Sequence, residues 1–280
     1  MALKLMYLTN DAEIAKIAES ASVDRIFLDL ELRGKVERQG HLDTVISHHS
    51  IDDVKKLRGS LKKAQLLVRV NSLYEGSKSE IDRVIEDGAD IVMLPFFKTA
   101  QEVRKFISLV NRRVKTCLLC ETPEAVENID EILNVPGIDE IHIGLNDLHL
   151  GYKMQFMFQL VADGTIDALC EKFRSKGIDY GFGGVGRVDV DNLLHAKNII
   201  SEHYRLGSSM VILSRAFCDN TKEHDPAKIS EVFNKGVKAL REFEKVAAAM
   251  SDDDFLRMHE DTKKRVSVIV DKINGKKQDI

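Results

Sequence analysis

Short apolar segments recur along the chain, and segments with helical periodicity lie between them. Eight apolar runs rich in β-branched residues span residues 3–9, 24–31, 64–70, 90–97, 116–121, 140–145, 179–185 and 208–217. Within most of these runs nearly every residue is apolar, which indicates parallel strands that are buried on both faces of a sheet.

The intervening segments predict amphipathic helices, because their apolar residues recur at intervals of three and four. Ser50, Thr99 and Thr122, the last followed by Pro123, are typical helix start signals. Eight alternating units in roughly 220 residues predict a (β/α)₈ TIM barrel. A doubly wound open sheet is the alternative, but no strand is followed by a GxGxxG turn that opens into a helix. The main predicted helices span residues 11–21, 50–61, 79–88, 99–113, 122–134 and 225–250.

The predicted domain boundary follows the helix 225–250, so residues 1–250 form the barrel and residues 251–280 form a C-terminal helical extension. This extra helix is expected to begin at Ser251, with three aspartates in its first turn, and to stop at Gly275. Its apolar stripe packs either on its own barrel or on a neighbouring subunit, and we expect a role in oligomerisation. The stripe comprises Phe255, Met258, Thr262, Val266, Ile269 and Ile273.

Composition and charge narrow the possible partners. The 280 residues carry a formal net charge of −4, and no cluster of basic residues suggests binding to nucleic acid or to a membrane surface. No apolar stretch reaches bilayer-spanning length, and the chain turns polar by Asn10. The four cysteines do not resemble a disulfide framework, so we expect a cytoplasmic protein. Cys117 and Cys120 lie three apart in a predicted strand and face opposite sides, which argues against a zinc or redox site.

Polar residues stand where the apolar runs end, and in a barrel the chemistry lies at those strand ends. Glu121 and Asp147 end two adjacent runs, so their carboxylates are expected to lie close together. Two such acids repel unless a hard divalent cation binds between them, which favours Mg²⁺ or Mn²⁺. The alternative is that Asp147 only caps a following turn. The remaining strand-end residues are Asp29, Glu31, Arg69, Asn71, Ser214 and Arg215.

The segment "ETPEAVENIDEILNVPGIDEIHIGLNDL", residues 121–148, resembles the signature of the HpcH/HpaI aldolase/citrate lyase family. "DRIFLDLE", "LLVRVN" and "GADIVMLPFFKTAQEV" resemble the other family blocks in the same order, and the resemblance covers about residues 20–217. It implies a pyruvate-dependent class II aldolase with a (β/α)₈ barrel, assembled as a homo-oligomer (trimer or hexamer) with an exchanged helix. It also implies a divalent metal (Mg²⁺, Mn²⁺ or Co²⁺) on Glu121 and Asp147, and it places the family arginine at Arg69.

The resemblance implies a 2-oxoacid substrate that binds through its carboxylate and keto oxygens. Cleavage of a carbon–carbon bond beside a pyruvyl unit leaves an enolate, which a Lewis-acidic metal and the planar donors of Arg69 would stabilise. A purely structural Arg69, paired with a barrel acid, is the alternative. Glu31 is expected to order water on the metal or the adjoining loop. Gly144, Leu145 and Asn146 are expected to contribute to substrate binding.

The sequence departs from the family pattern at Leu32, where many members carry a histidine that serves as acid or base. His41, oriented by Asp43, is the substitute base that we expect, with His149 as a second candidate. A surface histidine is the alternative for each of them. Citrate lyase-like relatives also lack that histidine, so a citryl- or malyl-CoA-type lyase stays open, as does a barrel that binds a 2-oxoacid or sugar without turnover.

The glycine-rich segment "YGFGGVGRV" is expected to form a turn after the seventh strand, in the phosphate-binding quarter of such barrels. Gly183, Gly184 and Arg187 there are candidates to bind a phosphate or a second carboxylate. Alternatively, the glycines only permit a tight turn. The expected reaction is that of a carbon–carbon lyase of EC 4.1 type, which cleaves or forms a 4-hydroxy-2-oxoacid to give pyruvate and an aldehyde.

Overall fold

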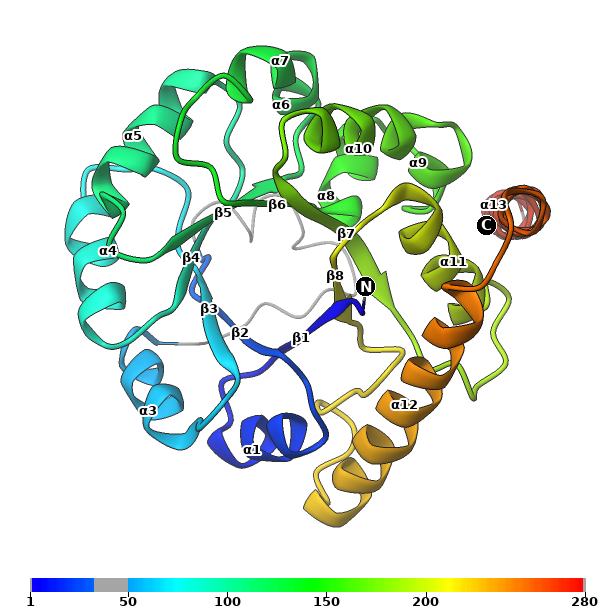
Figure 1. Ribbon diagram of the computed structural model, residues 1–280, viewed down its shortest axis with the longest axis horizontal. Coiled ribbons are helices and arrows are strands. Elements are labelled where there is room, and N and C mark those ends of the chain that lie inside the picture. Colours follow the sequence, from blue (N-terminus) through cyan, green and yellow to red (C-terminus); the bar gives the residue numbers. More distant parts are fainter. Residues whose placement is uncertain (1, 33–49, 279–280) are drawn as a thin grey trace. The chain divides into compact units, whose positions relative to one another are not determined.

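The strands alternate with helices as the apolar pattern predicts. The computed structural model describes residues 2–32 and 50–278, with side chains through residue 275. Its eight strands neighbour one another in sequence order and close into a barrel, which confirms the (β/α)₈ prediction over the open sheet (Figure 1). They are β1 (Lys4–Leu8), β2 (Arg25–Asp29), β3 (Gln65–Arg69), β4 (Ile91–Leu94), β5 (Lys115–Cys120), β6 (Glu140–Ile143), β7 (Asp179–Val185) and β8 (Met210–Leu213).

The predicted helices match observed helices closely, except that the predicted helix 122–134 is two short helices broken at Asn128. None of the described helices is long and apolar enough to cross a membrane. They are α1 (Ala12–Ser20), α3 (Asp52–Ser60), α4 (Ser77–Glu86), α5 (Ala100–Val110), α6 (Pro123–Glu127), α7 (Ile129–Ile132), α8 (Leu145–Gly151), α9 (Gln159–Ala162), α10 (Thr165–Ser175), α11 (Ala196–Leu206), α12 (Pro226–Ala247) and α13 (Asp252–Gln278). Four described helices, α8 to α11, lie between residues 145 and 206, where none of the main predicted helices falls.

The chain forms two compact units, Leu5–His142 and Ile143–Ile280 with the first four residues. The first unit holds β2 to β5 with helices α1 and α3 to α7, and the second holds β7, β8 and helices α8 to α13. This division differs from the predicted boundary after residue 250, which falls between α12 and α13. That residues 251–280 form a separate extension stays a prediction.

The predicted start signals are confirmed at two of three helices. Thr99 and Glu102 form a reciprocal capping box before α5, and the Thr122 hydroxyl accepts the backbone N–H of Ala125 at the start of α6. Ser50 does not cap α3, which begins at Asp52. Instead, the carboxylate of Asp53, within the first turn of α3, accepts the backbone N–H of Ser50 at 2.8 Å.

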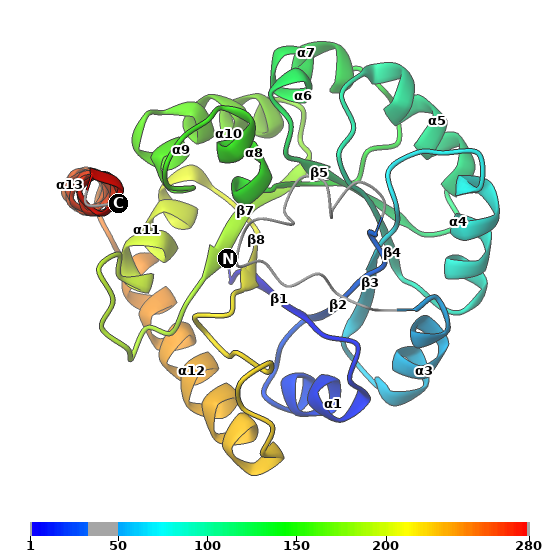
Figure 2. The same cartoon turned by 180° about the vertical axis from the view of Figure 1, so that it is seen from behind.

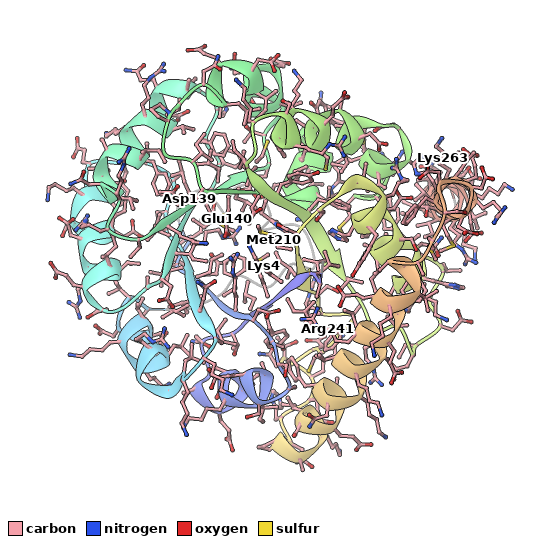
Figure 3. All side chains as sticks on the ribbon, viewed as in Figure 1. Lys4, Asp139, Glu140, Met210, Arg241 and Lys263 are labelled. Carbon is pink, nitrogen blue, oxygen red and sulfur yellow. The ribbon has the colours of Figure 1, made fainter. Side chains whose placement is uncertain are left out.

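A fully buried ion pair joins the amino-terminal ends of β2 and β6 in the first unit. Arg25 donates two parallel hydrogen bonds to Glu140, at 2.6 and 2.7 Å, and each side chain is only 1% exposed. The Nε of Arg25 also donates to Gln65 Oε1 at 3.1 Å, at the start of β3. Glu140, the first residue of β6, is labelled in Figure 3. The pair lies at the barrel end that stabilises the fold rather than the end that carries chemistry.

Helix α13 packs on α11 and α9 of its own chain, and the three helices lie side by side in both Figure 1 and Figure 2. Thr262 and Val266 of the predicted stripe are buried there. Asn198 of α11 donates to both Asp261 and Thr262, at 2.9 and 3.2 Å. This part of the stripe therefore packs on helices of the chain's own barrel, which is one of the two predicted alternatives.

The predicted start of α13 is confirmed, because Ser251 Oγ accepts the Asp254 N–H while the Asp254 carboxylate accepts the Ser251 N–H. The predicted stop at Gly275 is wrong, since the helix continues to Gln278. Gly275 does not adopt the left-handed backbone that ends a helix at a glycine.

Candidate active site

An arginine–carboxylate cluster, made of Asp29, Glu31 and Arg69, lies at the carboxyl-terminal ends of β2 and β3. Arg69 Nε donates to Asp29 Oδ1 at 2.8 Å and Nη2 donates to Asp29 Oδ2 at 2.7 Å. Arg69 Nη1 is 3.5 Å from Glu31 Oε2. Both carboxylates are buried, whereas the Arg69 side chain stays 12% exposed. The two acids are therefore shielded from solvent, and Arg69 is the member of the cluster that solvent or a ligand can reach.

Strand register brings these side chains together. β2 and β3 are parallel, and Asp29 pairs directly with Arg69 at the last position of each strand. Asp29 Oδ1 also accepts the backbone N–H of Glu31 at 3.0 Å, which bends the chain after the strand and keeps Glu31 beside the guanidinium. One side of the Arg69 guanidinium therefore forms the structural ion pair with a barrel acid that the alternative interpretation predicts.

The other side of the Arg69 guanidinium still has donors. An arginine has five N–H groups, and the two hydrogen bonds to Asp29 use Nε and one hydrogen of Nη2. Burial alone lowers the pKa of Arg69, but the charge and hydrogen bonds of Asp29 outweigh it, and Glu31 and Glu121 add to this effect. The net pKa is raised, so Arg69 is a permanent cation whose Nη donors suit a planar anion such as a carboxylate or enolate.

Glu121 follows β5 directly and is 4% exposed. Its Oε1 accepts the backbone N–H of Phe96 at 3.2 Å. Phe96 has a φ of 53°, a left-handed conformation that is strained for a bulky residue. This strained backbone binds Glu121, the carboxylate whose charge also raises the pKa of Arg69. Backbone strain of this kind is typical of functional sites. The sequence contains no signal for this conformation.

Asp147 belongs to the second unit and lies in the first turn of α8, not at the end of β6 itself. The cap residue of α8 is Gly144, and no side-chain hydrogen bond caps this helix, so Asp147 is not its N-cap. Asp147 is 9% exposed, and Asn146 Nδ2 donates to its Oδ1 at 3.2 Å. His149 is 8% exposed, and its Nδ1 contacts the Leu145 carbonyl at 3.1 Å.

The donor chemistry of Glu121 and Asp147 fits a hard divalent cation. Both are buried carboxylates, which is the ligand type that Mg²⁺ and Mn²⁺ prefer, and such ions complete their shell with water and substrate oxygens. Within residues 2–32 and 50–275, no group of three or more His, Cys, Asp or Glu side chains is arranged to hold a metal alone.

The glycine-rich segment is not a turn after β7, because Gly181, Gly183 and Gly184 lie within the strand. A Cβ at Gly181 would lie 2.2 Å from the Met210 carbonyl oxygen. Gly183 has a φ of +51° and faces Leu145, whose Cδ1 would be 2.5 Å from an added Cβ. Close packing therefore accounts for Gly181 and Gly183. The register of β7 against β8 shifts between Gly181 and Gly184.

Arg187 follows this strand and is paired with Asp189, whose carboxylate accepts from both Nε and Nη2. The hydrogen bonds that Arg187 donates to Asp189 raise the pKa of Arg187. An anion at Arg187 would have to share the guanidinium with Asp189.

Two predicted site residues, His41 and Asp43, lie outside the described residues. Leu32 is described, and its side chain is 46% exposed next to the arginine–carboxylate cluster. All four cysteines are buried and form no disulfide, and burial raises the pKa of Cys120 to about 12.

A closed barrel with an arginine and buried acids at its strand ends defines the class of (β/α)₈ proteins that carry their chemistry at that face. The family model for HpcH/HpaI aldolase/citrate lyase matches residues 4–175, and the chain belongs to this family.

Curated relatives match part of the chain. The chain is 31% identical to a 2-keto-3-deoxy-L-rhamnonate aldolase of Salmonella gallinarum over 112 residues, which cover 29% of the chain and 42% of the relative. It is 30% identical to the enzyme of that name from Escherichia coli O6:K15:H31 over 140 residues, or 39% and 52% of the two chains. The chain thus spans about half the length of the curated relatives it matches.

The crystal structure of HpcH/HpaI aldolase from Desulfitobacterium hafniense DCB-2 is similar, with a TM-score of 0.59, 18% identity and coverage of 86% of this chain and 93% of that one. Citrate synthase SbnG has a TM-score of 0.60, 16% identity and coverage of 84% and 94%. At these identities the structures support the fold alone.

Proposed function

We propose that the protein is a divalent-metal-dependent carbon–carbon lyase. In this proposal it cleaves or forms a 4-hydroxy-2-oxoacid, with pyruvate or a close 2-oxoacid as one product and an aldehyde as the other. The single observation that carries the proposal is the arginine–carboxylate cluster, in which a permanently charged Arg69 is fixed by Asp29 and keeps donors on its exposed side. Membership of an aldolase/citrate lyase family supports the reaction class.

Arg69 is the residue that we propose to bind the oxygens of the 2-oxoacid. As the carbon–carbon bond breaks, negative charge moves onto the former keto oxygen, and a preorganised guanidinium stabilises that charge without first having to reorient. Asp29 supplies the preorganisation, because its two oxygens fix the guanidinium plane. Glu31 is proposed to order water beside the guanidinium.

Glu121 and Asp147 are the residues that we propose to hold the metal ion (Mg²⁺, Mn²⁺ or Co²⁺). When bound, such an ion supplies Lewis acidity toward the keto oxygen of the substrate. Gly144, Leu145 and Asn146 are proposed to line the substrate beside Asp147. His41 with Asp43 remains the proposed acid–base pair, and the proposed setting is the cytoplasm.

Proton exchange of pyruvate tests the proposed function. An enzyme that forms the pyruvate enolate should exchange the pyruvate methyl protons for deuterium in D₂O when Mg²⁺ or Mn²⁺ is present, because the enolate is reprotonated from solvent. The exchange is measured by proton NMR with and without the protein. A protein that binds pyruvate, as judged by calorimetry, but exchanges no protons would be a binding barrel rather than a lyase.

We also propose that the chain forms a homo-oligomer in which the extension takes part. Leu256 and Val268 of α13 are 60% and 49% exposed, although Thr262 and Val266 pack on the chain's own helices. Truncation before Ser251 should therefore lower the mass of the assembly in multi-angle light scattering. An unchanged mass for the truncated chain would remove α13 from the interface.

A further inference from the structure

Asn71 links the backbone after β2 to the carboxyl-terminal end of β3. It lies two residues after Arg69, and its Oδ1 accepts the backbone N–H of Leu32 at 3.0 Å. Leu32 directly follows Glu31, whose own N–H is held by Asp29. Consecutive peptide N–H groups after β2 are thus bound by two side chains, and together these bonds define the path of the backbone that carries Glu31.

Glu80 of α4 in turn fixes the orientation of Asn71. Glu80 Oε1 accepts the side-chain Nδ2–H of Asn71 at 2.8 Å and the backbone N–H of Asn71 at 3.2 Å. A carboxylate accepts hydrogen bonds and donates none, so the Asn71 amide must present its nitrogen to Glu80 and its oxygen to Leu32. The orientation of this amide follows from Glu80.

Glu80 is costly for the fold as it stands. The residue is 8% exposed, and its second oxygen, Oε2, has no hydrogen-bond partner in the part of the chain that the structure describes. A buried carboxylate with an unmatched oxygen lowers stability, so packing alone does not explain an acid at this position. Such local costs are typical of residues that serve a site.

We propose that Asn71, oriented by Glu80, is a positioning residue for the reaction. It fixes the backbone at Leu32 and thereby keeps Glu31 beside Arg69, where Glu31 Oε2 is 3.5 Å from Nη1. Neither Asn71 nor Glu80 is assigned contact with substrate. The inference rests on the proposed function, because its consequence is read out as enolate formation.

The first test is a pair of truncations. Asn71→Ala and Glu80→Ala should each lower the kcat of pyruvate proton exchange about ten- to a hundredfold, the range for residues that orient a catalytic group, with little change in KM. The double variant should be no slower than either single variant, because both act through one contact. Glu86→Ala is the matched control, since Glu86 is exposed on the same helix.

Conservative variants separate positioning from folding, even where a truncation unfolds the protein. Glu80→Gln keeps an acceptor oxygen for Asn71 and removes the charge, so it should retain activity within about threefold. Asn71→Asp keeps the acceptor for Leu32 but places a second acid against Glu80, and it should lose activity. Adding Glu80→Gln to the Asn71→Asp variant should raise its rate of pyruvate proton exchange about tenfold.

Hydrogen exchange of the Leu32 amide gives a readout that does not depend on activity. Protection of this amide should fall in Asn71→Ala and Glu80→Ala and stay unchanged in Glu86→Ala. A folded Asn71→Ala variant with an unprotected Leu32 amide and wild-type exchange of pyruvate would overturn the positioning role while the proposed function stands. A wild-type protein that exchanges no pyruvate protons would instead overturn the proposed function, and the positioning role with it.

Discussion

Replacing Arg69 by lysine should slow enolate formation by roughly ten- to a thousandfold, while the divalent metal still binds. The arginine makes two parallel bonds to Asp29 and keeps Nη donors for the substrate. A lysine ammonium has three donors on a single atom, so it cannot hold both Asp29 oxygens and offer a planar pair of donors to an enolate. The charge is kept, and only the geometry is lost.

Pyruvate methyl exchange and Mn²⁺ affinity should be measured on the same preparation of Arg69→Lys. Arg104→Lys is the matched control, because Arg104 has a 54% exposed side chain on α5. Wild-type exchange in Arg69→Lys would show that Arg69 only pairs with Asp29 for stability. Loss of Mn²⁺ binding together with activity would place Arg69 in support of the metal site instead.

Removing one partner of the buried Arg25–Glu140 pair should destabilise the protein by about 3–5 kcal/mol. Both side chains are 1% exposed, so Arg25→Ala leaves the Glu140 carboxylate in the core with no guanidinium partner, and Gln65 loses its bond as well. The ammonium of Lys115 is 3.6 Å from Glu140 Oε1 and only partly compensates. The free energy of unfolding is to be measured by urea denaturation followed by circular dichroism.

Two further variants test the cause of this loss. Replacing both partners with apolar residues, Arg25→Met with Glu140→Leu, should recover most of the stability, because no unpaired charge remains buried. Lys235→Ala, which breaks an exposed pair with Glu231, should leave the stability nearly unchanged, because solvent screens the pair. An Arg25→Ala variant as stable as the Lys235→Ala variant would contradict this account of the core.

The strand ends were predictable from the sequence because parallel strands of similar length end at one face of a barrel. Asp29 and Arg69 show this directly, since both close their strands and pair in register. The helix starts at Thr99 and Thr122 were equally local, because a capping side chain bonds to the backbone three residues ahead.

The rest depended on tertiary contacts that no local pattern encodes. The left-handed backbone of Phe96 is visible only in the structure, as is the bond between Asn71 and Glu80. The glycines of β7 resembled a turn because glycine permits both turns and close packing, and the packing partner Met210 lies on another strand. Strand β6 ends at Ile143, and Asp147 therefore lies in α8. The apolar run continues past Ile143, so the sequence does not indicate where the strand ends.

The central proposal is that Glu121 and Asp147 bind a metal ion that enolate formation requires. The most direct measurement is the rate of pyruvate methyl exchange in D₂O after exhaustive chelation, then after addition of Mg²⁺, Mn²⁺ or Co²⁺, for wild type, Glu121→Gln and Asp147→Asn. Each substitution removes an anionic oxygen ligand while keeping the shape of the side chain. We expect chelation to abolish exchange in the wild type, the metals to restore it, and neither variant to recover at metal concentrations that saturate wild type. A full rate after chelation, or in either variant, would contradict the claim.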